Sequence, residues 1–328
     1  MLWHSDVKDI YSGYELYPLS GGAEQVVFDG PSPSPRTAKI IEKLREVVCL
    51  SEEGRLLDVG CGNGAFLQSF NRLFPKWRLS GFETNENHRK DILDLPGAEG
   101  FHSGSLDRVE SLFDIISMTY VIEHLSDPTC VMKTIRRLLN PGGILFIQTA
   151  HFIENPFDLT VRDHCSHFSL DSLDIAVKQA GFEPRTTTSH WIPKEIGLVA
   201  TPVEEVLKVI LHPNWSSLVQ SVEKSLDWLN RVADHATNTA RNGRFGIFGT
   251  AIAGTWLAAT LREEVNFFVD EDPLRQGKSH LGLPVLKLDQ VPEDTSVYLA
   301  FPTQLADSIY RRLKISYPAL NLVRPPEM

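Results

Sequence analysis

The sequence predicts an α/β protein with two doubly wound parallel sheets, the second smaller than the first. Apolar strand candidates alternate with helical patterns over residues 36–195, which is typical of a parallel sheet covered by helices on both faces. The glycine-rich turn LLDVGCGNG, residues 56–64, joins the first of these strands to a helix. A further strand, small-residue turn and helix begin at Gly243. We therefore predict an N-terminal arm at 1–35, a first α/β domain at 36–195, a helical linker at 196–241 and a second, Rossmann-like α/β domain at 242–328.

Length and composition agree with this organisation. A chain of 328 residues suggests about two domains. The hydrophobic share of 42% and the charged share of 23% exclude a mainly disordered protein. No run of 18 apolar residues occurs, and residues 1–10 carry charges where a secretion signal has its apolar core. The formal net charge of −10 argues against a nucleic-acid partner, and no membrane partner is expected.

The four cysteines are isolated in the sequence. None forms a CxxC pair, so the pattern suggests neither a zinc knuckle nor a disulfide framework, and no metal site is expected. Single cysteines of this kind fit a reducing compartment, which predicts a cytoplasmic protein. The four are Cys49, Cys61, Cys130 and Cys165.

Periodicity and turn residues define the elements of the first domain. The connector GPSPSP at 30–35 cannot be helical, so the arm before it either lies on the next domain or covers a substrate. An apolar stripe that includes Ile40 and Leu44 predicts a helix from Arg36. Asp127 as N-cap and Pro128 as first helical residue begin a later helix. The strand candidates are 55–59, 78–82, 112–118, 143–149 and 182–188, and the other helix candidates are 65–74, 86–93, 128–139 and 169–180.

The linker is expected to be one helix. Its apolar residues alternate in spacing between three and four, which gives a continuous seam along the helix. The seam fits either packing between the two domains or a homodimer. Its members are Val219, Val222, Leu226, Leu229, Ala233, Ala236 and Ala240. Beyond the linker, strands are expected at 245–248, 265–269, 297–301 and 320–323, with a helix at 256–261.

The glycine-rich turn is the most informative motif. It reads Asp58-x-Gly60-x-Gly62-x-Gly64. Glycines allow a tight turn and a close approach to a ligand. The spacing differs from the GxGxxG of dinucleotide sites, and a carboxylate before the turn suits an ammonium group rather than a phosphate. Glu83, at the end of the next strand, can accept hydrogen bonds from both hydroxyls of a ribose.

Together these residues resemble the donor site of class I S-adenosylmethionine-dependent methyltransferases, over about residues 36–190. The segments FDII at 113–116, YVIEHL at 120–125 and NPGG at 140–143 match further motifs of that family in order. The resemblance implies a class I Rossmann-like fold, S-adenosylmethionine as cofactor and S-adenosylhomocysteine as product. It adds Cys61, Ser105 and Tyr120 to the donor-binding candidates. The alternative is a Rossmann-like domain for another nucleotide.

The acceptor side is predicted from histidines that follow the fourth and fifth strands. Ligands of such sheets bind beyond the carboxyl ends of the strands. The loop PFDLTVRDHCSHFS at 156–169 contains Asp163, His164 and His167, and His124 follows the fourth strand. Methyl transfer to oxygen or to an activated carbon releases a proton, which a histidine can accept near neutral pH. We expect His164 or His124 to be the catalytic base, with Asp163 orienting an imidazole. The alternative is a purely structural role for these histidines.

The second domain carries a weaker nucleotide signal. The stretch GIFGTAIAG at 246–254 follows a strand and opens a helix, and Asp270 lies 21 residues after Gly249, near the spacing of a ribose acid. Gly249, Gly254 and Asp270 are therefore candidate nucleotide contacts. The alternative is a Rossmann-like domain that binds no nucleotide.

The order of the domains and the stretch VDEDPLRQGKSHLGLPV at 269–285 resemble sugar C-methyltransferases that act on nucleotide-linked deoxysugars. In that resemblance His164 matches the base histidine, and Asp163 replaces a glutamate. That family usually begins with a zinc domain that contains four cysteines, and this sequence shows no such domain. Its catalytic tyrosines are also replaced, one by Val161 in the loop and one by Ser32 or Ser34 in the connector. The expected function is methylation, at carbon or oxygen, of a sugar or sugar nucleotide. The alternatives are methylation of another polar small molecule and a non-catalytic protein that binds S-adenosylmethionine or a nucleotide.

Overall fold

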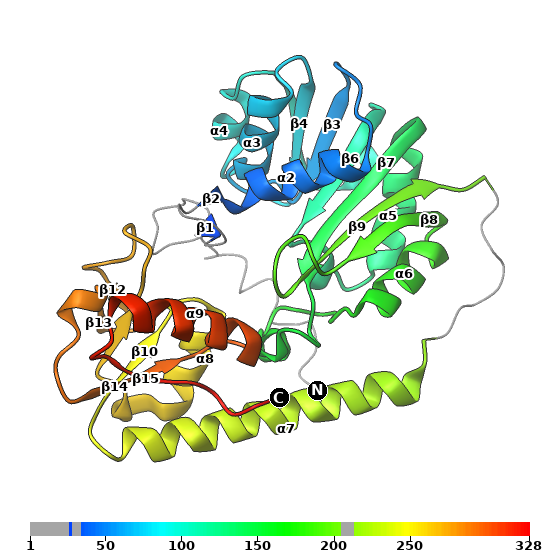
Figure 1. Cartoon of the computed structure of the whole chain (residues 1–328). Coiled ribbons are helices and arrows are strands. Elements are labelled where there is room, and N and C mark those ends of the chain that lie inside the picture. Colours follow the sequence, from blue (N-terminus) through cyan, green and yellow to red (C-terminus); the bar gives the residue numbers. More distant parts are fainter. Residues whose placement is uncertain (1–25, 28–33, 205–212) are drawn as a thin grey trace. The chain divides into compact units, whose positions relative to one another are not determined.

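The computed structural model describes residues 26–27, 34–204 and 213–328, and these fall into two compact units (Figure 1). Unit 1 comprises the described residues up to His151 and those from Arg162 to Pro213. Unit 2 comprises residues 152–161 and 214–328. Most of the predicted N-terminal arm, including Tyr11, Tyr14 and Tyr17, lies outside the described residues. Within it, the two short strands β1 (Val26–Val27) and β2 (Ser34–Pro35) pair in antiparallel fashion.

Unit 1 is built on a seven-stranded sheet with the order β5-β4-β3-β6-β7-β9-β8. Strand β9 runs antiparallel to both of its neighbours, and the other neighbouring pairs are parallel. The parallel strands place their carboxyl ends along one edge of the sheet, and we call this the carboxyl edge. The strands are β3 (Arg55–Val59), β4 (Arg78–Glu83), β5 (Ala98–Ser103), β6 (Phe113–Thr119), β7 (Leu139–Ala150), β8 (Phe182–Thr188) and β9 (Glu195–Pro202).

Helices cover both faces of this sheet because its strands are apolar on both sides. In β3, Leu56 belongs to one core cluster and Leu57 to the other, and neither side chain is exposed to solvent. Side chains alternate between the two faces of a strand, so two consecutive residues of one strand contribute to the cores on opposite faces of the sheet. Helices α2 (Arg36–Val47) and α3 (Ala65–Leu73) supply the core on the Leu56 side, and α5 (Pro128–Arg137) and α6 (Leu170–Gln179) supply the core on the Leu57 side. Helix α4 (Arg89–Leu93) adds one further turn.

Two boundaries differ from the sequence prediction. The first sheet does not end near residue 195, because β9 occupies Glu195–Pro202 and pairs with both β7 and β8. The first residues of the predicted linker therefore belong to strand β9. The predicted linker helix is shorter than expected and corresponds to α7 (Trp215–Ala240). The buried residues of α7 belong to the core of unit 2, so α7 is part of that unit and not a connector. Of the predicted seam, Leu229, Ala236 and Ala240 are buried, whereas Val219 and Leu226 are exposed.

Unit 2 contains a six-stranded sheet with the order β12-β13-β11-β10-β14-β15, parallel except for the edge strand β12. Helices α7 and α8 (Ile252–Leu261) cover one face, and α9 (Thr303–Ser316) covers the other. The strands are β10 (Arg244–Phe248), β11 (Phe267–Val269), β12 (Ser279–His280), β13 (Leu283–Leu286), β14 (Thr295–Leu299) and β15 (Asn321–Val323). This is the Rossmann-like pattern that the sequence predicts.

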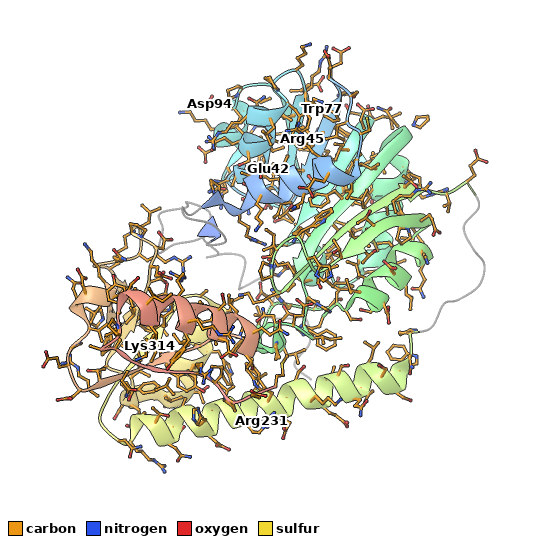
Figure 2. The ribbon with its side chains drawn as sticks, in the orientation of Figure 1. Glu42, Arg45, Trp77, Asp94, Arg231 and Lys314 are labelled. Atoms are coloured by element: carbon orange, nitrogen blue, oxygen red, sulfur yellow. The ribbon has the colours of Figure 1, made fainter. Side chains whose placement is uncertain are left out.

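Local packing explains several of these elements. Trp77, which is labelled in Figure 2, is a buried residue of unit 1. It packs against Gly54, where a β-carbon would lie 2.8 Å from the indole ring. In unit 2 the Arg231 guanidinium donates to the carbonyl oxygen of Glu327 at 2.7 Å, and this bond fixes the end of the chain on α7. The Lys314 ammonium donates to the carbonyl oxygen of Leu320 and so joins α9 to the approach to β15. Within the described residues no helix is both long and apolar enough to cross a bilayer.

Candidate functional site

The glycine turn leads from the carboxyl end of β3 into α3. Gly60, Gly62 and Gly64 all have positive φ, at 73°, 49° and 82°, a region that side-chain-bearing residues rarely adopt. The backbone N–H of Gly60 donates to the carbonyl oxygen of Phe82 at 2.8 Å, so the turn is tied to the end of β4. Gly64 forms the N-cap of α3. The turn therefore has the backbone conformation that its glycines predict.

Asp58 lies beneath this turn with 2% of its surface exposed. The Ser117 hydroxyl of β6 donates to its Oδ1 at 2.7 Å. Burial and, to a smaller extent, the charge of Glu83 raise the pKa of Asp58, whereas the hydrogen bond from Ser117 lowers it. The resulting pKa is about 7. Asp58 is therefore an acid that changes protonation near neutral pH at the base of the turn.

Glu83 ends β4 beside the turn. Its Oε1 accepts a hydrogen bond from the Gly62 N–H at 3.4 Å, and its Oε2 accepts one from the Thr84 N–H at 2.7 Å. The backbone thus orients both oxygens at the carboxyl edge. Cys61, in contrast, buries its thiol against Gly81, where a β-carbon would lie 2.6 Å from Sγ. Burial raises the pKa of that thiol, so the Cys61 side chain is a packing group.

The remaining donor candidates follow β5 and β6. Ser105 is exposed and forms the N-cap of a short 3₁₀ helix, η2 (Leu106–Arg108), just after Gly104 with its φ of 86°. Tyr120 follows β6 and has a φ of 57°, which is unusual for a bulky residue. Its N–H donates to the carbonyl oxygen of Gln148 at 2.8 Å. All the donor candidates of unit 1 therefore lie at or just beyond the carboxyl ends of β3, β4, β5 and β6.

On the acceptor side, the structure pairs Asp163 with His124. The Nδ1 atom of His124 lies 3.1 Å from Asp163 Oδ2 and 3.3 Å from the Asp163 carbonyl oxygen. Burial lowers the pKa of His124, but the hydrogen bond that its ring donates to Asp163 and the charge of Glu123 outweigh burial and raise the pKa overall. The same hydrogen bond lowers the pKa of Asp163. The predicted orienting carboxylate therefore serves His124, which lies on the 3₁₀ helix η3 (Ile122–His124).

His164 lies next to this pair. Its ring centre is 4.8 Å from that of His124, edge to face, and 6.2 Å from that of His167. Glu123 is almost fully buried, and burial raises its pKa. Its Oε2 accepts a hydrogen bond from the Thr149 hydroxyl at 2.9 Å, while Oε1 has no hydrogen-bond partner among the described residues. One atom each from Glu123, His124 and His164 lie within 4.8 Å of one another, a spacing that would allow a shared cation and that the sequence reading did not anticipate.

The predicted catalytic loop is divided between the units. Residues Pro156–Thr160 form the 3₁₀ helix η4 in unit 2, where the Phe157 ring lies 5.3 Å from Trp228 and 5.6 Å from Trp256. The residues from Arg162 onward, which include all three polar candidates of the loop, belong to unit 1. The first part of the loop is thus a packing segment.

In unit 2, the Asp270 carboxylate is hydrogen-bonded to neighbouring residues of the same turn region. Its Oδ2 accepts hydrogen bonds from the Thr250 hydroxyl at 2.6 Å and the Thr250 N–H at 3.1 Å, and its Oδ1 accepts one from the Asp272 N–H at 3.0 Å. The Nη1 atom of Arg275 lies 3.5 Å from Asp270 Oδ2, so the two side chains form an ion pair. A ribose at Asp270 would compete with all of these contacts.

The two glycines of that turn have structural reasons of their own. Gly249 has a φ of 95°. A β-carbon on Gly254 would lie 2.0 Å from the Gly249 carbonyl oxygen, so only glycine lets α8 pack this closely on the turn. Both positions are thus explained by packing without a nucleotide.

Sequence reasoning missed several polar residues at the carboxyl edge of unit 1. Glu123 stands directly before His124 in the segment YVIEHL, and that adjacency was the available signal. Ser117 and Thr149 lie inside strands and carry no local signal. Arg36 and Glu195 form a buried ion pair across 159 residues of chain, with Nε 2.8 Å from Oε1.

Comparison with known proteins classifies this unit. Residues 34–187 match a family model described as a methyltransferase domain. A ubiquinone biosynthesis O-methyltransferase of Xanthomonas oryzae pv. oryzae is 30% identical over 120 residues, which is 33% of this chain and 47% of the relative. The protein of that name from Caulobacter vibrioides is 30% identical over 102 residues, 29% of this chain and 40% of its own. The solved structure of human N-acetylserotonin methyltransferase with S-adenosylmethionine overlaps 51% of each chain, at 13% identity and a TM-score of 0.44.

The segment 34–187 is therefore a methyltransferase domain of the class I, S-adenosylmethionine-dependent kind. The chain spans about half the length of the curated relatives that it matches. The match ends at residue 187, before α7 and the α/β sheet of unit 2, and it includes the segment 152–161 that belongs to unit 2.

Proposed function

We propose that this chain transfers a methyl group from S-adenosylmethionine to a polar small molecule, with a sugar or nucleotide-linked sugar as the acceptor. The observation that carries the proposal is the Asp163–His124 pair. It lies at the same edge of the sheet as the glycine turn and Glu83. A donor site and an oriented imidazole at one edge are what transfer to a proton-bearing acceptor requires.

The donor half of the site fits S-adenosylmethionine. The positive-φ glycines let the backbone approach a ligand closely, and Glu83 offers two oriented oxygens to ribose hydroxyls. Asp58 beneath the turn would favour the ammonium of the methionine part when it is ionised. The bound cofactor supplies an electrophilic methyl group on its sulfonium.

The acceptor half supplies a base. Asp163 receives the hydrogen bond from the Nδ1–H of His124, which fixes the imidazole so that Nε2 is the atom that accepts a proton. Methyl transfer to the acceptor oxygen or carbon would break the methyl–sulfur bond and release S-adenosylhomocysteine. The acceptor proton would move to Nε2, and the pair would then carry an imidazolium beside a carboxylate. His164, edge to face with His124, would line the acceptor site. This assignment makes His124 the base in preference to His164.

The sugar acceptor is supported by the resemblance of the chain to sugar C-methyltransferases, in its domain order and in the segment 269–285. A second candidate is a phenolic hydroxyl, because the relatives of the domain are named as O-methyltransferases of ubiquinone biosynthesis. Both acceptors lose a proton on methylation, so the same base serves either one.

The test is a transfer assay on the whole chain with isotope-labelled S-adenosylmethionine. One arm offers pooled nucleotide sugars, and the other offers simple catechols, with methylated products identified by mass spectrometry. We expect product in the sugar arm and its loss with His124→Ala. Product in the catechol arm alone would replace the sugar by a phenol, and the absence of product in both arms would contradict the proposal.

A further inference from the structure

A buried polar network lies behind the turn that leads from β6 to His124. Arg36, the first residue of α2, places Nε 2.8 Å from Glu195 Oε1 and donates from Nη2 to Oε2 at 3.0 Å. Both side chains are more than nine-tenths buried. The Gln148 amide donates to the same Oε2 at 2.7 Å. The network therefore joins the start of α2 to the end of β7 and the start of β9.

Tyr120 is held within this network. The Arg36 guanidinium carbon lies 3.7 Å from the centre of the Tyr120 ring, which is cation–π distance. The Tyr120 side chain also hydrogen-bonds Glu195, and its backbone N–H donates to the Gln148 carbonyl oxygen at 2.8 Å. The ring, the hydroxyl and the backbone of one residue are thus each fixed by a member of the same network.

This restraint coincides with an unfavourable backbone conformation. A φ of 57° is rarely adopted by a bulky residue and persists only where the surroundings impose it. Tyr120 is the residue at which the chain turns from β6 toward η3, and η3 carries Glu123 and His124. The position of His124 at the carboxyl edge therefore depends on that turn.

We infer that Arg36 is a positioning residue: through Glu195 and the Tyr120 ring it holds the left-handed turn that places His124 at the acceptor site. This inference rests on the proposed function for its catalytic consequence, but the geometric claim stands on its own. Arginine suits the role because its planar guanidinium can pair with a carboxylate through two nitrogens and stack on an aromatic ring at once. Lysine can replace only the charge.

The chain provides a matched control in Arg55. This arginine also pairs with a glutamate, Glu99, at 2.9 Å, and its guanidinium lies 5.3 Å from the centre of the Phe113 ring. It lies at the amino end of β3, the opposite edge of the sheet from His124. Arg55→Met therefore removes the same kinds of contact without touching the turn.

The experiment compares Arg36→Lys, Arg36→Met and Arg55→Met in the full chain. The first readout is the NMR signal of the His124 ring in protein with isotope-labelled histidine, assigned by its loss in His124→Ala. We expect Arg36→Lys and Arg36→Met to shift that signal and Arg55→Met to leave it in place. The signal of His88, which caps α4 and lies 3.0 Å from Asp91, should be unchanged in all three variants. Arg36→Lys keeps the buried positive charge and is the milder change. If Arg36→Met does not fold, the His124 signal of Arg36→Lys tests the positioning role.

The second readout is turnover against donor affinity. Misplacing a catalytic group by about 1 Å can cost about a hundredfold in rate, so we expect a loss of that order in kcat for the Arg36 variants. S-adenosylhomocysteine affinity should change far less. An unmoved His124 signal with wild-type kcat in both variants would overturn the inference. If the wild-type chain shows no transfer at all, the proposed function fails, and the NMR arm still tests the positioning role.

Discussion

Among single residues, Asp58 makes the stability of the protein depend on pH in an unusual direction. Its pKa rises on folding from 3.8 to about 7, so the folded state keeps the proton to higher pH than the unfolded chain. Folding is therefore favoured by this group at acid pH, and that advantage is lost progressively as pH rises from about 4 to about 7. Above that range Asp58 is a buried charge that costs stability.

We predict that Asp58→Asn unfolds at higher urea concentration than wild type at pH 8 and at nearly the same concentration near pH 4. Each unit of pKa shift corresponds to about 1.4 kcal/mol, so the gain at pH 8 should be a few kcal/mol. The same variant should bind S-adenosylhomocysteine more weakly, since the ammonium loses its carboxylate. The control is Asp107→Asn in η2, because the Asp107 carboxylate is exposed and its ion pair with Arg137 lies at the surface. Equal urea midpoints for Asp58→Asn and wild type at both pH values would show that Asp58 does not titrate as stated.

His124 and Asp163 give a prediction for the pH dependence of the reaction. The base must be neutral to accept a proton, so kcat should rise with pH through the raised pKa of His124. Asp163→Asn removes the main interaction that raises this pKa, so the acid limb of the profile should move to lower pH. His124→Ala should lower kcat by about a hundred- to ten-thousand-fold, with S-adenosylhomocysteine affinity within about threefold of wild type.

Chelation separates this account from a metal-dependent one. Glu123, His124 and His164 lie close enough to share a cation, but a histidine that acts as base needs none. We expect kcat to be unchanged after dialysis against a chelator. A loss of activity that zinc or another divalent ion restores would move the role of His124 from base to ligand. His164→Ala should then abolish metal retention as well.

The sequence singled out side chains that the structure brings close together, but not which of them pair. Asp163 and His164 are neighbours in sequence, and their adjacency favoured a pair, whereas Asp163 contacts His124, 39 residues earlier. The Arg36–Glu195 pair spans 159 residues and leaves no local trace. Contacts of this kind depend on the strand order, which periodicity alone does not provide.

The glycine turn is the element on which the donor site depends. A β-carbon on Gly60 would lie 2.3 Å from a methyl group of Val121, in addition to the cost of its φ of 73°. We predict that Gly60→Ala lowers the free energy of unfolding by more than about 1 kcal/mol and weakens S-adenosylhomocysteine binding. Gly100→Ala in β5 is the matched control, because its nearest neighbours would be 3.5 Å away. Urea unfolding and calorimetric titration of the two variants provide the comparison, and equal behaviour would contradict the role of the turn.

Elements with a clear periodic or turn signal were predicted closely. The strand at 55–59 and the strand at 182–188 were found at their predicted bounds, and α5 begins at Pro128 after its Asp127 cap. Strand β9 was missed although Pro193 marks a turn directly before it, where the Glu195 N–H donates to the Ile192 carbonyl oxygen at 3.3 Å. The chain turns at Lys194, whose φ is 72°, a conformation in which glycine is usual and lysine is not.

For the whole molecule, the sequence indicated two successive α/β units. It did not indicate that a segment lying between two parts of unit 1 belongs to unit 2. Phe157 packs on Trp228 and Trp256, so residues 152–161 join unit 2, although they lie between two parts of unit 1. These partners are distant in the sequence, so local patterns do not indicate the assignment. The seam of α7 likewise divides into buried and exposed positions that the 3-4 spacing alone treats as equal.

We expect unit 1 to bind S-adenosylmethionine at the glycine turn and Glu83, apart from the acceptor base. Isothermal titration of the full chain with S-adenosylhomocysteine measures this binding. We predict saturable binding of one equivalent, weakened about tenfold or more by Glu83→Ala, which corresponds to about 1.4 kcal/mol or more, and changed less than about threefold by Asp163→Asn. The absence of binding at millimolar ligand, or equal affinity for Glu83→Ala and wild type, would contradict the account.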